Sequence, residues 1–265
     1  MRFSVSALVL SAVLSTAASQ SPAFAADAIG EVAATVGKPS ASGPSGDREL
    51  AAGAPVYEDD KIVVRSGNAQ IILNDGTKLV VGPGSTLVLD RFLMKGGNTA
   101  QKVSIKALRG TFRFITGRSA KSAYDIQTAS ATIGIRGTGI DFWSKQNTGV
   151  AVHVGLVSLC SSGSKSGNCV ELREGCHVGR AGGNEARELT ARVKGTSIVN
   201  NLPYILSQAT LDTKFYLPIQ NCRSSLPHEF EGGAEQQPTH KGKGGRRNNN
   251  NNEGRVGEGS LTVEG

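Results

Sequence analysis

The chain has 265 residues, of which 34 are glycine and only 5% are aromatic, and its formal net charge is +7. Short runs of Val, Ile and Thr between glycine turns are typical of an all-β fold with many short strands. Charges of both signs are interspersed along the sequence, which favours a solvated surface and argues against nucleic-acid binding. Anionic glycans or lipid head groups fit this surplus of positive charge better.

The first 25 residues resemble a cleavable signal peptide. A short positive start precedes an apolar run over residues 5–14, and the segment ends in the small-x-small pattern of Ala23 and Ala25. We expect cleavage between Ala25 and Ala26 and a periplasmic or secreted protein. The alternative is an uncleaved anchor, but the run is short beside the roughly 20 residues that span a membrane. We expect no transmembrane segment in the mature chain.

Alternating and β-branched runs predict strands along most of the chain. The predicted strands cover residues 29–36, 61–65, 69–73, 77–81, 86–89, 103–107, 123–128, 132–135, 140–144, 150–159, 171–173 and 177–178, with a weak last one at 186–193. Pro203 suits the first turn of a short helix within residues 201–211. From residue 231 onward the sequence has no apolar period and predicts disorder.

Two turn motifs divide these strands: Asp75-Gly76-Thr77 and Arg136-Gly137-Thr138. Asp-Gly is a strong hairpin signal because these residues adopt the positive φ values of a tight turn. We expect Arg136 to hydrogen-bond to carbonyl groups or to pair with a nearby acid. The acids at 59, 60 and 75 stand in turn sequence, so we expect them to stabilise turns.

Alternation also predicts which side chains face the core. Phe112 and Phe114 alternate with Thr111 and Arg113, so we expect both Phe rings inside and the other two side chains on a wet face. His153 stands between two valines of a predicted strand, and we expect it on the wet face too.

The four cysteines are even in number, and the predicted compartment is oxidising, so we expect two disulfides. Three pairings are open. We favour Cys160 with Cys169, which closes a short loop, and Cys176 with Cys222, which ties down the carboxyl-terminal segment. The alternative is a metal site that uses three of these cysteines and His177, but its spacing is not one of the usual zinc arrangements.

Three ordered segments resemble the FecR domain. They are LAAGAPVYEDDKIVVRSGNAQIILNDGTKLVVGPGSTLVL, TASATIGIRGTGIDFW and VAVHVGLVSL, and together they span about residues 50–159. The resemblance implies an all-β, solenoid-like or sandwich-like extracytoplasmic module. In its best-known regulators that module passes a signal from an outer-membrane transporter to a sigma factor. This sequence shows neither their cytoplasmic amino-terminal segment nor their spanning helix, so we expect fold and compartment to carry over, and not the regulatory role.

The predicted organisation has five parts. They are the signal peptide (1–25), a lead strand with a Gly/Pro/Ser loop (26–49), the FecR-like β domain (50–159), a cysteine-containing extension (160–230) and a disordered tail (231–265).

The sequence contains no Gly-x-Ser-x-Gly elbow, no His-Glu-x-x-His pair and no phosphate loop. We therefore predict a protein that is not an enzyme and carries no cofactor or metal. The leading hypothesis is a periplasmic binding or scaffold module for a protein or a cell-envelope glycan. The alternative is a soluble sensory component that works with a separate membrane partner.

Overall fold

The structure is a computed structural model that describes residues 26–163 and 167–226. The predicted signal peptide and the predicted disordered tail lie outside these residues. Strands from the first half of the chain are β1 (Ala28–Val36), β2 (Ser40–Ser42), β3 (Arg48–Glu49), β4 (Pro55–Tyr57), β5 (Lys61–Val64), β6 (Asn68–Leu73), β7 (Lys78–Val81), β8 (Ser85–Gly96) and β9 (Thr99–Ile115). Those that follow are β10 (Tyr124–Thr128), β11 (Ala131–Ser144), β12 (Thr148–Ser161), β13 (Cys169–Arg173), β14 (His177–Gly182) and β15 (Glu185–Glu188). The prediction of an all-β fold is confirmed.

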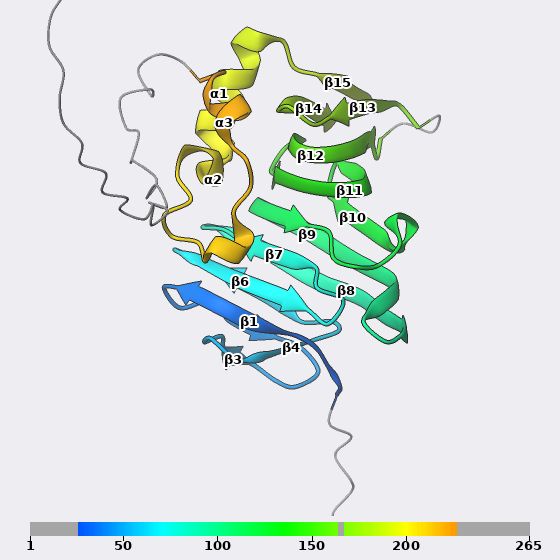
Figure 1. Ribbon diagram of the computed structural model, residues 1–265, viewed down its shortest axis with the longest axis vertical. Coiled ribbons are helices and arrows are strands. Elements are labelled where there is room, and N and C mark those ends of the chain that lie inside the picture. Colours follow the sequence, from blue (N-terminus) through cyan, green and yellow to red (C-terminus); the bar gives the residue numbers. More distant parts are fainter. Residues whose placement is uncertain (1–25, 164–166, 227–265) are drawn as a thin grey trace, which may run out of the picture. The chain divides into compact units, whose positions relative to one another are not determined.

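All the described strands join one mixed sheet, which folds over into two layers. The two layers stay connected as one sheet because β9, β11 and β12 are long enough to belong to both. The first half of β9 pairs with β8 and, in parallel, with β10, whereas its second half pairs with β7 and β11. The helix-side layer runs β4-β1-β6-β7-β9-β11-β12-β14-β15, and the far layer runs β3-β2-β5-β8-β9-β10-β11-β12-β13. Figure 1 shows the labelled strands of the helix-side layer stacked from β15 at one end to β1 and β4 at the other.

Each of the three long strands bends at a glycine with positive φ: Gly110 in β9, Gly137 in β11 and Gly155 in β12. A Cβ would strain this conformation. At Gly155 it would also lie 2.1 Å from the carbonyl oxygen of Gly137. The Arg136-Gly137-Thr138 motif is therefore a bend inside one continuous strand, where the register with β12 shifts, and not a turn between two strands.

Apolar side chains from both layers meet in a single core. The Phe112 and Phe142 rings stack there with centroids 5.0 Å apart. Phe114 is also fully buried, which confirms the predicted inward face of β9. Ile29 in β1 and Ala186 in β15 belong to the same core, so it extends beyond residues 50–159.

Residues 191–226, which we call the covering segment, leave the sheet and pack on the outward face of the helix-side layer (Figure 1). They form α1 (Ala191–Asn201), α2 (Pro203–Leu206), a 3₁₀ turn (Thr213–Phe215) and α3 (Gln220–Arg223). Their apolar contacts on the sheet include Val80, Trp143, Ala151 and Val178. Among the described residues, no helix is long and apolar enough to cross a membrane.

The sequence predicted α2 but not α1. The weak strand expected at 186–193 ends at Glu188, and α1 starts at Ala191. Gly195 and several β-branched residues give α1 a low intrinsic helix propensity. Buried contacts of Ile198 with the sheet supply the stability that propensity does not.

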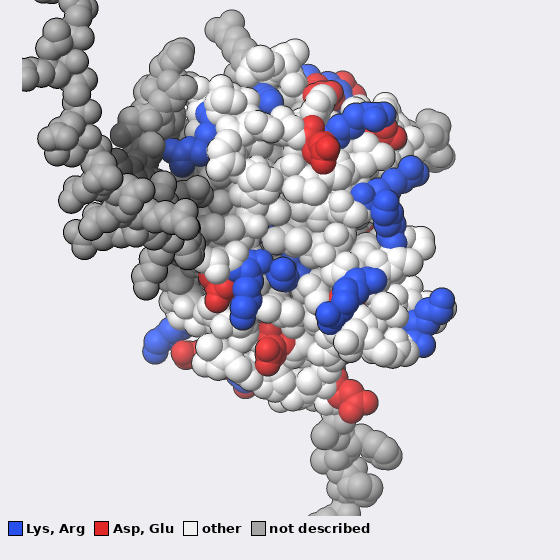
Figure 2. All heavy atoms as spheres, viewed as in Figure 1, with Lys and Arg blue, Asp and Glu red and all other residues white. Residues whose placement is uncertain are grey.

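On the face drawn in Figure 2, Lys and Arg side chains are separated by uncharged surface, with acidic groups between some of them. The net positive charge is thus dispersed over this face and does not form one continuous basic patch.

Candidate functional site

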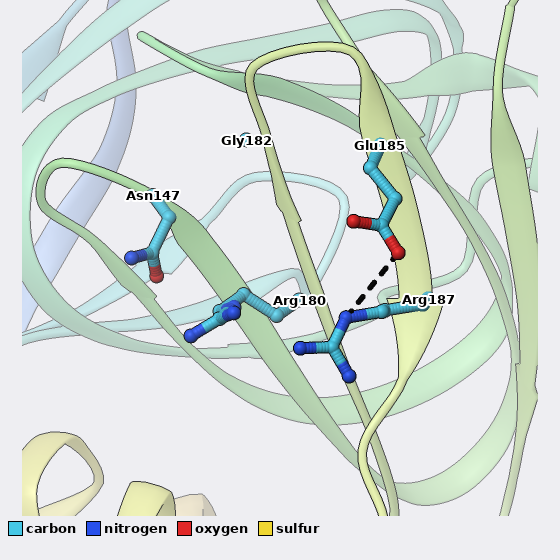
Figure 3. A pocket seen from close by; sticks show the side chains of 5 residues that line it. All are labelled: Asn147, Arg180, Gly182, Glu185 and Arg187. Atoms are coloured by element: carbon cyan, nitrogen blue, oxygen red, sulfur yellow. Dashed lines mark ion pairs between the residues drawn. The ribbon is translucent and has the colours of Figure 1, made fainter.

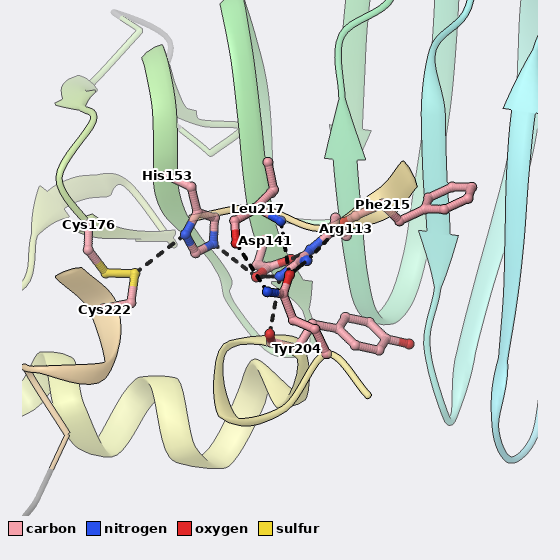
Figure 4. Close-up of polar contacts among 9 residues, drawn as sticks. Arg113, Asp141, His153, Cys176, Tyr204, Phe215, Leu217 and Cys222 are labelled. Atoms are coloured by element: carbon pink, nitrogen blue, oxygen red, sulfur yellow. Dashed lines mark hydrogen bonds and ion pairs between the residues drawn. A yellow bond between two sulfur atoms is a disulfide. The ribbon is translucent and has the colours of Figure 1, made fainter. Parts of the chain in front are cut away.

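Three charged or titratable side chains lie side by side on the outward face of the helix-side layer (Figure 4). Arg113 in β9 forms a two-point ion pair with Asp141 in β11, with Nε–Oδ1 and Nη2–Oδ2 distances of 2.7 Å. His153 in β12 places Nε2 2.9 Å from Asp141 Oδ2. All three side chains are at most 1% exposed. The predicted wet face for Thr111, Arg113 and His153 is therefore wrong, because the covering segment lies on it.

The covering segment supplies the remaining acceptors of Arg113. Nη2 donates to the carbonyl of Tyr204 at 3.2 Å, and Nη1 donates to the carbonyl of Phe215 at 3.0 Å and to Gln208 Oε1. A guanidinium has five N–H donors, and all five have an acceptor here. Gln208 also exchanges hydrogen bonds with the backbone of Leu217 at 2.9 and 3.1 Å. This network fastens the covering segment to the sheet.

Asp141 stays ionised in this network. Burial alone would raise the pKa of its carboxyl. The charge of Arg113 and the hydrogen bonds from Arg113 and His153 lower that pKa by more than burial raises it, so it lies well below its usual range. Because every charge is paired and sealed from solvent, the cluster has no open position for a substrate. Its role is to position the covering segment.

The disulfides are Cys160–Cys169 and Cys176–Cys222, the two pairs favoured from the sequence. The second joins the turn just before β14 to α3, and its Cys222 sulfur lies 3.7 Å from Nδ1 of His153. It therefore closes the network of Figure 4 at the far end of the covering segment. All four sulfurs are bonded, so the cysteine metal site is contradicted, and His177 instead pairs with Glu188 at 2.7 Å.

The predicted turn residues lie apart from this cluster. Asp75 is fully buried in the β6–β7 turn, where it accepts hydrogen bonds from the backbone of Thr77 at 2.9 Å, from Ser119 at 2.6 Å and from Tyr124 at 3.1 Å. Gly76 follows it with φ 84°. Asp75 thus holds the turn against the start of β10.

The Arg136-Gly137-Thr138 motif differs from the Asp75 turn, because its charged side chain is exposed. Arg136 is exposed and has no hydrogen-bond or ion-pair partner in the part of the chain that is described, so the expected pairing is absent. Directly after the motif, a Cβ on Gly139 would lie 2.4 Å from a methyl carbon of Leu217. The glycine therefore gives the covering segment room to approach the strand.

Between the covering segment and the sheet is a groove, which we call the Pro83–Pro203 groove. Its two hollows have volumes of about 500 and 270 Å³ and share Pro83 and Pro203. Arg109 and Lys145 line the larger hollow, with no acidic residue beside them. Lys145 donates to Asn201 at 2.8 Å in α1.

Two buried polar atoms lie at this groove without a partner among the described residues. They are the hydroxyl of Thr111, which lines the larger hollow, and the hydroxyl of Tyr204, which lines the smaller one. Burial raises the pKa of the Tyr204 phenol, so it remains a neutral donor. Buried polar groups usually have partners, so both hydroxyls call for an explanation.

Sequence reasoning missed Arg113, Asp141 and Gln208 as a group. Arginine and aspartate at strand positions that alternate with core residues read as solvated charges. The one available signal was the surplus of apolar residues in 198–219, which need a surface to cover.

The comparison with protein-family models agrees with the sequence resemblance. Residues 60–158 match the family model described as FecR protein. Two crystal structures of a "putative anti-sigma factor" from Parabacteroides distasonis are similar at 15% identity and a TM-score of 0.38; the match covers 50% of this chain and 63% of theirs, less than two thirds of their length. No curated protein matches the chain. Residues 60–158 of this chain form a FecR domain.

Proposed function

We propose that this protein is a non-enzymatic extracytoplasmic module that binds a protein or a cell-envelope glycan in the Pro83–Pro203 groove. The observation that carries the proposal is the groove itself. It combines two cations, Arg109 and Lys145, with the unpartnered hydroxyls of Thr111 and Tyr204. Concave sites with a few convergent polar groups are where proteins usually bind their ligands.

The compartment is part of the proposal. Two disulfides in one chain are typical of oxidising compartments such as the periplasm. The predicted signal peptide and its cleavage between Ala25 and Ala26 fall outside the described residues. Sequencing the amino terminus of the exported protein tests that cleavage directly.

The groove is a single unit only while the covering segment stays in place. Pro203 and Asn201 form one wall, and the bend of β9 at Arg109 and the turn at Pro83 form the other. Arg113 of β9 pairs with Asp141 and donates to the carbonyl of Tyr204, the residue after Pro203, so the pair links the strand of one wall to the segment of the other. The buried network is thereby a positioning device for the groove.

Photo-crosslinking in intact cells tests the proposal. A crosslinking amino acid at the exposed positions Arg109 and Asn200 is expected to give one discrete adduct. The same residue at Leu93, exposed on β8 of the far layer, is the control and is expected to give none. No adduct at either groove position, or the same adducts at all three, would contradict the proposal.

A sensory role is the second candidate, and the FecR domain is the observation that favours it. The module would then bind a separate membrane partner through the same groove. Charge reversal at Arg109 and Lys145 should change envelope-linked transcripts. If the charge-reversed variant loses the groove adduct but the transcripts do not change, the groove binds a partner and the sensory role is excluded.

A further inference from the structure

A separate hollow, of about 250 Å³, lies on the β14–β15 hairpin (Figure 3) and shares no lining residue with the Pro83–Pro203 groove. Arg180 and Arg187 are directly opposite one another in the register of these two strands. Like charges in directly opposed positions destabilise an antiparallel pair, since their Cβ atoms are about 5 Å apart. Repulsion between the two arginines therefore destabilises the hairpin, and nothing in the fold requires arginine at both positions.

The surroundings do not neutralise the two arginines. Glu185 pairs with Arg187 through Nε at 3.3 Å, and its side chain is 67% exposed. Exposed pairs of this kind contribute little. Arg180 is half-buried and has no ion-pair or hydrogen-bond partner within residues 26–163 and 167–226. The hollow thus has a net positive charge with unused N–H donors.

Asn147 bounds the same hollow from the turn between β11 and β12 (Figure 3). Its Oδ1 accepts the indole N–H of Trp143 at 3.1 Å. An indole nitrogen only donates, so the amide oxygen must face it, and the Asn147 NH₂ group is left with two donors. Gly182 has no side chain to fill the space. The side chains that line the hollow are therefore mostly donors, and Glu185 is the one acid among them.

We propose that this hollow, the Arg180–Arg187 site, binds a phosphate group. Guanidinium groups bind oxyanions through paired N–H donors. A carboxylate has two oxygens and is satisfied by one guanidinium, whereas a phosphate has more oxygens and a larger charge and matches two. The phosphate group belongs either to free phosphate or to a lipid head group. The site is independent of the groove, so its failure would leave the proposed groove function standing.

The test is titration of the full exported chain with inorganic phosphate at constant ionic strength, followed by the NMR amide signals of β14 and β15. Saturable shifts centred on Arg180 and Arg187 are expected. The R180Q/R187Q variant should bind roughly tenfold more weakly or not at all, since charge-assisted hydrogen bonds are lost. Arg173→Gln is the matched control, because it removes an exposed charge from neighbouring β13 and should leave phosphate binding unchanged.

A third variant separates binding from folding. Glu185→Gln removes the one acid of the hollow, so it should tighten phosphate binding several-fold at low salt. A merely misfolded hairpin could not produce that gain. Absence of saturable shifts in the parent protein, or equal binding by parent and R180Q/R187Q, would overturn the proposal.

Vesicles identify the source of the phosphate group. Co-sedimentation with phosphatidylglycerol vesicles but not with phosphatidylcholine vesicles, lost in R180Q/R187Q, would assign the site to an anionic lipid head group. Binding of inorganic phosphate without co-sedimentation would assign it to a free phosphate compound.

Discussion

Arg113 and Arg180 project from the same outward face of the helix-side layer, yet their surroundings are opposite. Arg113 is fully buried, and each of its five N–H donors has an acceptor. Arg180 is half-buried and has no described partner, and another arginine stands directly across from it. The difference is the covering segment, which lies over β9, β11 and Val178 at the start of β14 but leaves the hollow around Arg180 and Arg187 open. Strand alternation sets the face of a side chain, whereas a segment distant in sequence decides what that face meets.

The largest effect that tests this comparison is the removal of Asp141. Asp141→Ala leaves the Arg113 guanidinium buried without its counter-charge, and breaking a buried pair in this way costs about 3–5 kcal/mol. Urea unfolding of the parent and the variant measures the loss. Glu171→Ala is the control, because Glu171 pairs with the exposed Arg173 and such pairs contribute about 1 kcal/mol or less. Equal losses of unfolding free energy in the two variants would show that the buried Asp141 pair stabilises the fold no more than an exposed pair does.

The pH dependence gives this experiment a second measurement. The folded-state pKa of Asp141 is held well below its unfolded value of about 3.9. Its contribution to stability is therefore fully present above about pH 4 and decreases as the pH falls below that value. Between roughly pH 5 and pH 2 the unfolding free energy of the parent should fall more steeply than that of Asp141→Ala. Parallel curves would contradict the assignment.

The next effect compares the two disulfides. Cys176–Cys222 spans 46 residues and Cys160–Cys169 spans 9, so the chain-entropy estimate is about 4 kcal/mol for the first and about 2.5 kcal/mol for the second. Replacement of each pair by alanine, followed by urea unfolding, measures both. The longer crosslink also holds the covering segment near His153, so its loss should weaken the groove adduct at Arg109. A larger cost for the shorter crosslink would break the comparison.

The sequence was informative wherever structure depends on near neighbours. Phe112 and Phe114 are inside, the Asp75-Gly76 turn joins β6 and β7, and the resemblance to FecR is confirmed. These features follow from alternation, turn chemistry and motif order, all of which can be read within a few residues.

The sequence was uninformative wherever structure depends on distant segments. Arg113 donates hydrogen bonds to Gln208 and Phe215, which are about ninety to a hundred residues away in the sequence, and no local pattern predicts these contacts. α1 forms against its own propensity because Ile198 is buried on the sheet. The Arg180–Arg187 opposition likewise depends on a register that the turn after β14 fixes, and not on either residue alone.

The smallest expected effect on stability is at the Arg180–Arg187 site, which the covering segment leaves open. In phosphate-free buffer at low salt, Arg187→Gln should stabilise the protein by about 0.5 kcal/mol, because it relieves the like-charge opposition with Arg180. In 1 M salt, where screening acts over about 3 Å, that gain should vanish. Arg113→Gln is the counterpart on the covered end and should lose stability at both salt concentrations, since a buried pair is only weakly screened. If Arg187→Gln also lost more than about 1 kcal/mol, Arg187 would be a structural partner within the fold, and the contrast between the covered and open ends would not hold.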